Sequence, residues 1–156
     1  MPNQTVFERI EELLRKRAVP WEVLRHEPVY TSVEAAAVRG TPLASGAKAL
    51  VVKVDDALEL YVMPADRKLA SKKVRLARHV RSVRFASADE VLEQTGLRPG
   101  SIPPFGSLFG LTTICDPRLA EHETINFNAG DHAVSISMRF KDFVTAEDPV
   151  IAEIAE

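Results

Sequence analysis

The sequence Ala49-Leu-Val-Val-Lys-Val54-Asp-Asp-Ala-Leu58-Glu-Leu-Tyr-Val-Met63 lies in the first half of the chain and sets its architecture. Its two apolar runs are rich in β-branched and aromatic residues, which favour strands, and Asp55-Asp56-Ala57 separates them. This pattern predicts two strands, 49–54 and 58–63, joined by a hairpin. We expect the pair to form the centre of a β-sheet.

Two capping boxes predict helices on the N-terminal side of this hairpin. Thr5-x-x-Glu8 stands at the start of a predicted helix over 6–17. Thr31-x-x-Glu34 stands at the start of a short predicted helix over 33–38. Both motifs satisfy backbone N–H groups that the first turn of a helix leaves without partners.

The remainder of the chain mixes short strands and helices without a strand-helix-strand repeat. This mixture is typical of an α+β fold, so we expect one domain, residues 1–156, with a central mixed, mostly antiparallel sheet flanked by short helices. Near the C-terminus the sequence predicts one helical turn over 140–143 and then a frayed tail over 150–155. The other predicted elements are strands over 21–24, 83–85, 111–115, 124–127 and 133–137 and a helix over 68–79. A third capping box, Ser87-x-x-Glu90, predicts a helix between Ser87 and Gly96.

Composition and charge exclude several classes of protein. The 156 residues are 46% hydrophobic and 27% charged, with a formal net charge of −2, as in an ordinary globular protein. No apolar run approaches the roughly 20 residues needed to cross a bilayer. The N-terminal Met1-Pro-Asn-Gln4 has no features of a signal peptide. We therefore expect a cytoplasmic protein without a membrane partner.

Cofactor-dependent chemistry is not expected. The chain has a single cysteine, Cys115, and its four histidines lack the spacing of metal ligands, so we expect no metal site. Phosphate-binding loops, the dinucleotide-binding glycine motif and the serine-hydrolase elbow are absent from the sequence, and we expect no cofactor. Catalysis would then depend on positioning an activated bond and on stabilising charge with backbone donors.

The run Gly96-Leu-Arg-Pro-Gly-Ser-Ile-Pro-Pro-Phe-Gly106 alternates glycine and proline between regular elements. Proline fixes the backbone and removes a donor, whereas glycine adopts conformations that other residues avoid. We expect a stiff loop whose remaining N–H groups can bind a carbonyl oxygen or an anion. A tight connection between a helix and a strand is the alternative interpretation.

The segment from Arg67 to Arg84 is basic and contains no acidic residue. It is interpreted either as a solvated face or as a patch that contacts phosphates. The candidates for such contacts are Lys72, Lys73, Arg75 and Arg78.

Four motifs follow one another along the chain. They are Thr31-x-x-Glu34-Ala-Ala, Gly46-Ala-Lys48-Ala-Leu, Thr95-Gly-x-x-Pro-Gly100-Ser-Ile-Pro-Pro104-Phe-Gly106 and Asn128-Ala-Gly130-Asp-His132. In their order and spacing the chain resembles the YbaK/EbsC-type aminoacyl-tRNA editing domain over residues 5–145. That domain also occurs within or attached to bacterial prolyl-tRNA synthetases.

The resemblance implies a YbaK-like fold and a free-standing trans-editing deacylase. Such an enzyme hydrolyses the ester between a tRNA and a wrongly attached small amino acid, of the alanine, cysteine, serine or threonine class. The implied partners are the tRNA acceptor end and an aminoacyl-tRNA synthetase. The alternative is a catalytically silent module that binds the tRNA acceptor end in association with a synthetase.

The resemblance also implies roles for individual residues. Lys48 is expected to hold the terminal phosphate or the ribose end of the substrate, and the loop from Gly100 to Pro104 is expected to offer amides to the aminoacyl carbonyl. Independently of the resemblance, the charge of the basic segment around Lys72 to Arg78 makes it a candidate contact for the acceptor stem. The catalytic candidates are Lys48, Gly100, Ser101 and His132. The substrate-binding candidates are Thr31, Ile102, Pro103, Pro104, Phe105, Gly106, Asn128 and Gly130.

Several of these candidates also have a purely structural interpretation. Thr31 is equally suited to be a helix N-cap. Phe105 packs either against a substrate ring or in the core. His26 and His132 each make either a local hydrogen bond or a contact with the substrate.

Overall fold

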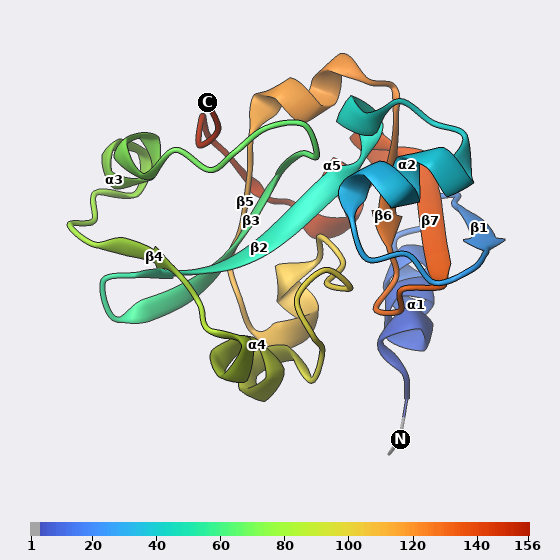
Figure 1. Ribbon diagram of the computed structural model, residues 1–156, viewed down its shortest axis with the longest axis horizontal. Coiled ribbons are helices and arrows are strands. Elements are labelled where there is room, and N and C mark those ends of the chain that lie inside the picture. Colours follow the sequence, from blue (N-terminus) through green and yellow to red (C-terminus); the bar gives the residue numbers. More distant parts are fainter. Residues whose placement is uncertain (1–3) are drawn as a thin grey trace.

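The computed structural model describes residues 4–156, in which five α-helices flank two β-sheets (Figure 1). Part of the N-terminal segment used to predict the absence of a signal peptide, residues 1–3, lies outside the described residues. The helices are α1 (Val6–Lys16), α2 (Ser32–Arg39), α3 (Ser71–Arg78), α4 (Ala88–Thr95) and α5 (Phe140–Glu147). The strands are β1 (Glu22–Arg25), β2 (Ala47–Val54), β3 (Ala57–Pro64), β4 (Val83–Phe85), β5 (Thr113–Cys115), β6 (Thr124–Asn128), β7 (Val134–Arg139) and β8 (Val150–Ile151).

The predicted hairpin lies in a five-stranded mixed sheet with the order β4-β2-β3-β5-β8. Strands β2 and β3 are antiparallel, and their register pairs Val54 with Ala57. The turn therefore contains only Asp55 and Asp56, one residue fewer than predicted. Asp55 has a φ of +51°, a left-handed conformation that aspartate tolerates and that suits a tight two-residue hairpin.

Three further strands form a second, antiparallel sheet with the order β1-β7-β6. The α+β class with mixed and antiparallel pairing is confirmed, although the strands divide between two sheets. An isolated bridge between Gly46 and Asn126 joins the sheets. This bridge brings the start of β2 beside the middle of β6, and the candidate site lies at that junction.

The predicted capping boxes form as expected. In α2, Thr31 Oγ1 accepts a hydrogen bond from the Glu34 N–H at 3.1 Å, and the Glu34 carboxylate accepts one from the Thr31 N–H. The same arrangement begins α1 at Thr5 and α4 at Ser87. These side chains satisfy first-turn N–H groups, and each cap contributes about 1 kcal/mol.

One apolar core extends between the two sheets, and a second lies on the other face of the five-stranded sheet. In the first, Val51 and Leu60 from the hairpin pack with Ile125, Phe127 and Ile136 from β6 and β7. The second contains the following buried residues from the hairpin, α3 and the C-terminal segment: Val52, Tyr61, Met63, Val74, Ile154 and Ala155. Burying each large aliphatic side chain contributes about 1.5–3 kcal/mol.

The predicted frayed tail over 150–155 is wrong. Strand β8 pairs in parallel with β5, and Ala155 forms a bridge with Leu69. The buried carboxylate of Asp116 accepts hydrogen bonds at 2.9 Å from the N–H groups of Ile154 and Ala155. These contacts fix the tail, and they come from residues that are distant in the sequence.

Two helix predictions also need correction. Helix α3 begins at Ser71 rather than at 68, because Leu69 is engaged in its bridge with Ala155. Helix α5 continues to Glu147, well beyond the predicted turn over 140–143. The buried Phe143 and Ala146 anchor the longer helix on the core.

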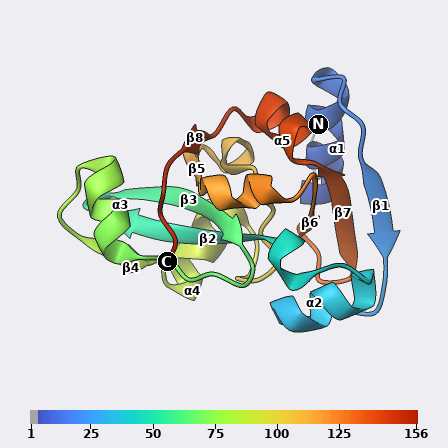
Figure 2. The ribbon, with the colours of Figure 1, turned by 90° about the horizontal axis from the view of Figure 1, so that it is seen from above.

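Helices α2 and α3 lie at opposite ends of the molecule in both ribbon views (Figures 1 and 2). The sheet junction adjoins α2, whereas α3 packs beside β4 at the far end of β2. Among residues 4–156, no helix has the length and apolar character that a bilayer crossing would require.

Candidate functional site

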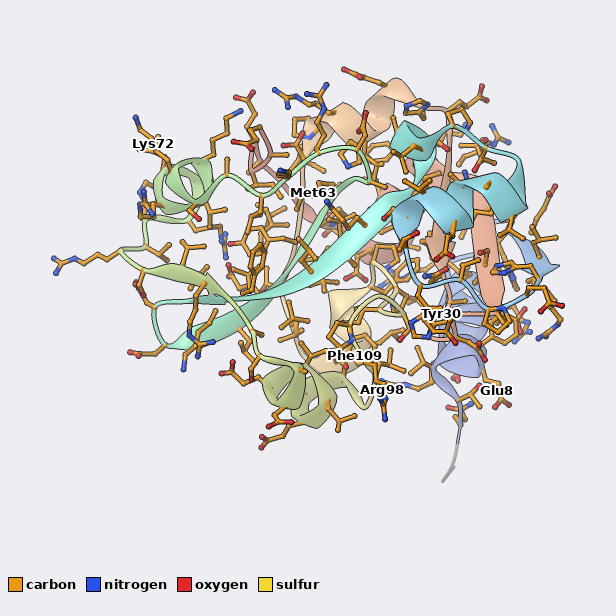
Figure 3. All side chains as sticks on the ribbon, viewed as in Figure 1. Glu8, Tyr30, Met63, Lys72, Arg98 and Phe109 are labelled. Atoms are coloured by element: carbon orange, nitrogen blue, oxygen red, sulfur yellow. The ribbon has the colours of Figure 1, made fainter. Side chains whose placement is uncertain are left out.

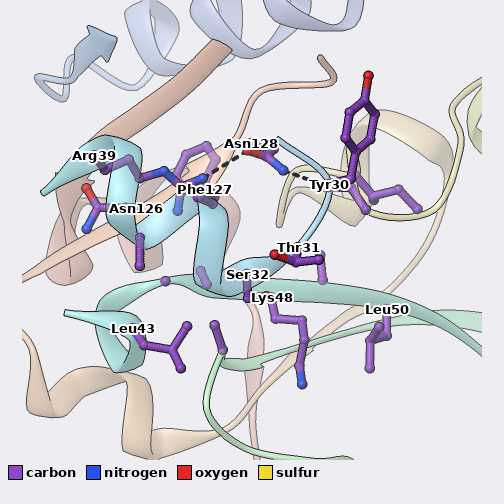
Figure 4. A pocket seen from close by; sticks show the side chains of 18 of the residues that line it. Tyr30, Thr31, Ser32, Arg39, Leu43, Lys48, Leu50, Asn126, Phe127 and Asn128 are labelled. Carbon is purple, nitrogen blue, oxygen red and sulfur yellow. Dashed lines mark hydrogen bonds between the residues drawn. The ribbon is translucent and has the colours of Figure 1, made fainter. Parts of the chain in front are cut away.

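A pocket of about 160 Å³ lies where α2 meets the start of β2 and the end of β6 (Figure 4). Its wall contains several residues with little or no side chain: Ala35, Ala36, Gly46, Ala47, Ala49 and Ala65. Pockets for drug-sized ligands have volumes of about 300–1,000 Å³, so this one suits a smaller group.

Lys48 lines the pocket, as predicted, from the second residue of β2. Its ammonium donates a hydrogen bond to the carbonyl oxygen of Arg67 and points away from Asn128 (Figure 4). Burial lowers the pKa of the Lys48 ammonium below its ordinary value, while Asp66 opposes that change and Lys68 adds to it. The side chain of Lys48 therefore lines the pocket while its ammonium is directed away from the loop and Asn128, and its contact with Arg67 must change if it binds a substrate on that side.

The loop after α4 contributes Gly100 and Ile102 to the pocket. Gly100 has a φ of +93°, which an L side chain rarely adopts. In the described part of the chain, the N–H groups of Gly100 and Ile102 have no hydrogen-bond acceptor. Two backbone donors of this loop thus remain available, as the alternation of glycine and proline predicts.

Asn128 holds this loop against the second sheet. Its side-chain amide donates to the Gly100 carbonyl at 2.7 Å, and its Oδ1 accepts from Nη2 of Arg39 at 2.9 Å. The predicted residue Asn128 therefore lines the pocket and connects α2, β6 and the loop. Thr31 also lines the pocket, but its hydroxyl is engaged with Glu34 in the helix cap.

The rest of the predicted loop turns inward. Ser101 is buried and its hydroxyl donates to the Arg98 carbonyl at 2.9 Å, so the catalytic candidate does not face the pocket. Phe105 is 0% exposed and packs edge-on against Phe127 and Phe143 with ring centroids 5.4 and 5.5 Å away. The expectation of a substrate-binding Phe105 is therefore corrected to a core position. The buried Pro103 and Pro104 do not line the pocket either.

Two predicted glycines are required by close packing outside the pocket. A Cβ on Gly106 would lie 2.5 Å from Thr113 Oγ1 and 2.8 Å from the Leu111 carbonyl oxygen. A Cβ on Gly130 would lie 2.8 Å from the side chain of Val6 on α1. The Gly130 N–H donates to the Ser101 carbonyl at 3.0 Å, so Gly130 supports the loop from behind.

His132 lies beside the pocket opening rather than in its wall. Its ring contacts that of Tyr30 with centroids 4.8 Å apart. A Cβ built on Gly100 would be 3.6 Å from His132 Nε2, which places the imidazole next to the loop. Tyr30 lines the pocket and is 70% exposed, so the two rings form an aromatic surface there.

The profile of the aminoacyl-tRNA editing domain matches residues 26–146. The chain belongs to this editing-domain family. It is 34% identical over 154 residues to the multifunctional Ser/Thr-tRNA deacylase ProXp-y of Escherichia coli K12, an alignment that covers 94% of this chain and 91% of that protein. It is 34% identical over 127 residues to the proline–tRNA ligase of Shouchella clausii KSM-K16, covering 80% of this chain and 21% of the ligase.

Solved structures share the fold of this editing domain. The crystal structure of the hypothetical protein APE2540 superposes with a TM-score of 0.86 at 28% identity, covering 96% of this chain and 100% of that one. A proposed trans-editing enzyme for prolyl-tRNA synthetase superposes with a TM-score of 0.86 at 21% identity, covering 99% of each chain. The family resemblance inferred from the sequence motifs is confirmed.

The basic residues predicted to contact tRNA do not adjoin the pocket of the editing domain. They lie on α3, and Figure 3 shows Lys72 and Tyr30 at opposite ends of the molecule. The Arg78 guanidinium is paired with Glu59, with Nη2 to Oε2 at 2.5 Å, and Lys73 donates to the Ala155 carbonyl at 2.8 Å. Lys72 and Arg75 are exposed. A tRNA contact at α3 would thus depend on these two side chains.

Sequence reasoning missed five polar or aromatic residues of the pocket: Tyr30, Ser32, Arg39, Asn126 and Phe127. Arg39 stands in the last turn of α2, where a basic residue is expected simply to complement the helix dipole. Burial lowers the pKa of its guanidinium to about 10, so it remains charged at neutral pH. Tyr30 precedes the capping box, and that position alone gave no functional signal.

Proposed function

We propose that this editing domain is an aminoacyl-tRNA deacylase that removes small amino acids, of the serine, threonine, alanine and cysteine class, from mischarged tRNA. One observation carries the proposal: a pocket of about 160 Å³, walled by alanines, opens beside Lys48 and the two free amides of the Gly100 loop. The relation to a curated Ser/Thr-tRNA deacylase over 94% of the chain supports the same class of substrate.

The reaction replaces an ester by an acid and an alcohol. Water adds to the aminoacyl carbonyl carbon, the bond from that carbon to the ribose oxygen breaks, and the ribose oxygen takes up a proton. We propose that the N–H groups of Gly100 and Ile102 donate to the carbonyl oxygen as negative charge develops on it. Removing one donor of this kind costs other enzymes roughly a hundredfold or more in rate.

The protein need not supply a nucleophile for this chemistry. An aminoacyl ester is activated, and the substrate's own ribose hydroxyl or amino group can assist the attacking water. The buried Ser101 hydroxyl, engaged with Arg98, accords with this interpretation. His132, at the pocket opening, stays a proposed contact with the substrate.

Lys48 is proposed to anchor the 3′-terminal nucleotide at the pocket opening. Its ammonium would exchange the Arg67 carbonyl for the phosphate or ribose end of the substrate. A lysine binds a phosphate as a mobile point charge, which suits such an exchange. A synthetase partner is proposed on the relation to a proline–tRNA ligase.

The proposal is tested by deacylation of tRNAs charged with serine, threonine, alanine or cysteine. We expect the wild-type protein to cleave at least one of these esters and Lys48→Ala to be slowed at least tenfold. Lys53→Ala, at the distant end of the same strand, is the matched control and should act like the wild type. A protein that binds tRNA but leaves every ester intact would instead be a silent binding module.

A further inference from the structure

The guanidinium of Arg39 lies in the pocket wall without a carboxylate partner. Its side chain is half-buried, and among residues 4–156 no aspartate or glutamate forms an ion pair with it. Glu34, on the same helix, is engaged instead by the N–H groups of Tyr30 and Thr31. A partly buried charge without a counterion carries a desolvation cost, which an anionic ligand would offset.

Two side chains hold this guanidinium in place. Its Nε donates to Ser135 Oγ at 2.8 Å. Its Nη2 donates to Asn128 Oδ1 at 2.9 Å, as Figure 4 shows. His26 in turn orients Ser135. The His26 Nδ1 faces the Glu27 carbonyl at 2.8 Å, which can only accept, so in the neutral ring Nδ1 carries the proton.

The remaining ring nitrogen of His26 then accepts the hydroxyl proton of Ser135, at 2.8 Å. This leaves the lone pairs of Ser135 Oγ for the guanidinium of Arg39. Hydrogen-bond donation therefore runs outward from Arg39 on both sides. It passes through Ser135 to the His26 ring and through Asn128 to the Gly100 carbonyl. Arg39 is therefore a fixed cation rather than a mobile one.

The third guanidinium nitrogen, Nη1, has no acceptor in the described part of the chain. A Cβ built on Gly46 would lie 3.8 Å from it, and both residues line the pocket. Because Gly46 has no side chain, no Cβ contacts this nitrogen from that side; Ala65 Cβ and the Leu43 carbonyl oxygen lie 3.2 Å from the place that such a Cβ would take. The pocket thus presents unpaired N–H donors on a fixed positive charge.

We propose that Arg39 forms an anion-binding subsite for a phosphodiester at the 3′ end of the tRNA. This inference rests on the proposed function. In an aminoacyl ester the carboxylate has lost its charge and the amino group is neutral or positive, so the phosphates are the only anions that the substrate carries. The planar guanidinium suits two phosphate oxygens at once, and Lys48 is then left to hold the ribose end.

The test compares two adenosine ligands, of which only one carries a phosphodiester, with the cytidine attached to it. Cytidylyl-(3′→5′)-adenosine reproduces the last two nucleotides of tRNA, and adenosine lacks the phosphate. Calorimetric titration at fixed salt measures the affinity of wild-type protein, Arg39→Gln, Arg39→Lys and the surface control Lys16→Gln. We expect Arg39→Gln to weaken the binding of the dinucleotide about ten- to hundredfold. The affinity for adenosine should stay within twofold of that of the wild type.

Arg39→Lys retains the charge but not the planar pair of donors, so we expect an intermediate loss for the dinucleotide. It also serves as the test variant if Arg39→Gln fails to fold. Lys16→Gln, which removes a charge from the exposed end of α1, should bind both ligands normally. Equal weakening of both ligands, or unchanged dinucleotide affinity, would overturn the subsite.

A deacylation assay on the wild-type protein separates this inference from the proposed function. If the wild type cleaves mischarged tRNA while dinucleotide affinity is independent of Arg39, the subsite alone is refuted. If the dinucleotide depends on Arg39 and no ester is cleaved, the subsite stands and the proposed function fails. If Arg39→Gln weakens the binding of free threonine rather than that of the dinucleotide, the anion that Arg39 binds is a carboxylate, and the assignment to phosphate is wrong.

Discussion

Replacing Gly100 with alanine tests whether the left-handed backbone of the loop positions the reaction. A Cβ at this position would meet only His132 Nε2, at 3.6 Å, which is an ordinary contact. The cost is therefore conformational, because an alanine at a φ of +93° loses about 1–2 kcal/mol. For a chain of this size that loss lowers the melting temperature by roughly 2–8 °C.

The loop would relieve this strain by rotating, and rotation would displace the N–H groups of Gly100 and Ile102. A displacement of about 1 Å in a positioning group can cost roughly a hundredfold in rate. We therefore expect Gly100→Ala to slow single-turnover deacylation of a mischarged tRNA at least tenfold. The melting temperature is measured by thermal unfolding on the same preparation.

Gly96→Ala is the matched control. Gly96 also has a positive φ, +74°, and a Cβ there would meet nothing within 4 Å. It ends α4 and does not line the pocket, so the same strain should lower stability without slowing deacylation. If both variants lose activity equally, or if Gly100→Ala deacylates at the wild-type rate, the reasoning about the loop is refuted.

Three further predictions concern the core, the half-buried acid Glu147 and α3. Phe105→Ala should lower the free energy of unfolding in urea by about 3–5 kcal/mol, whereas the same change at the 61% exposed Phe85 should stay within about 0.5 kcal/mol; similar losses would place Phe105 outside the core. Burial raises the pKa of Glu147 in the folded protein above its value in the unfolded chain. The stabilising contribution of the protonated carboxyl is therefore complete below the unfolded pKa and is lost as the pH rises through the folded pKa. Glu147→Gln should therefore gain stability relative to the wild type as the pH rises above the usual glutamate pKa of about 4.3, and a difference that stays constant with pH would contradict this. Replacing Lys72 and Arg75 with glutamine should weaken tRNA binding and lower its dependence on salt, and an unchanged salt slope would exclude α3 from the tRNA contact.

Much of the fold follows from short-range signals in the sequence. The capping boxes at Thr5, Thr31 and Ser87 each begin a helix where predicted, because the motif and the helix are neighbours in the chain. The C-terminal segment was mispredicted because its partners are remote. The N–H groups of Ile154 and Ala155 bind Asp116, which no local pattern indicates.

The candidate site was only partly predictable for the same reason. The motifs identified Lys48, Gly100 and Asn128, all of which line the pocket. They did not separate residues that face the pocket from those that turn into the core, as Phe105 does. The role of Arg39 depends on Ser135 and Asn128, which reach it from the second sheet.

The size of the aminoacyl group that the protein removes is the most direct measure of its function. The rates to compare are single-turnover hydrolysis of threonyl-tRNA or seryl-tRNA and of phenylalanyl-tRNA under identical conditions. The pocket of about 160 Å³ predicts rapid hydrolysis of at least one small ester and little or no hydrolysis of the bulky one. Equal rates for all three esters, or no hydrolysis of any, would contradict the assignment of this pocket as the editing site.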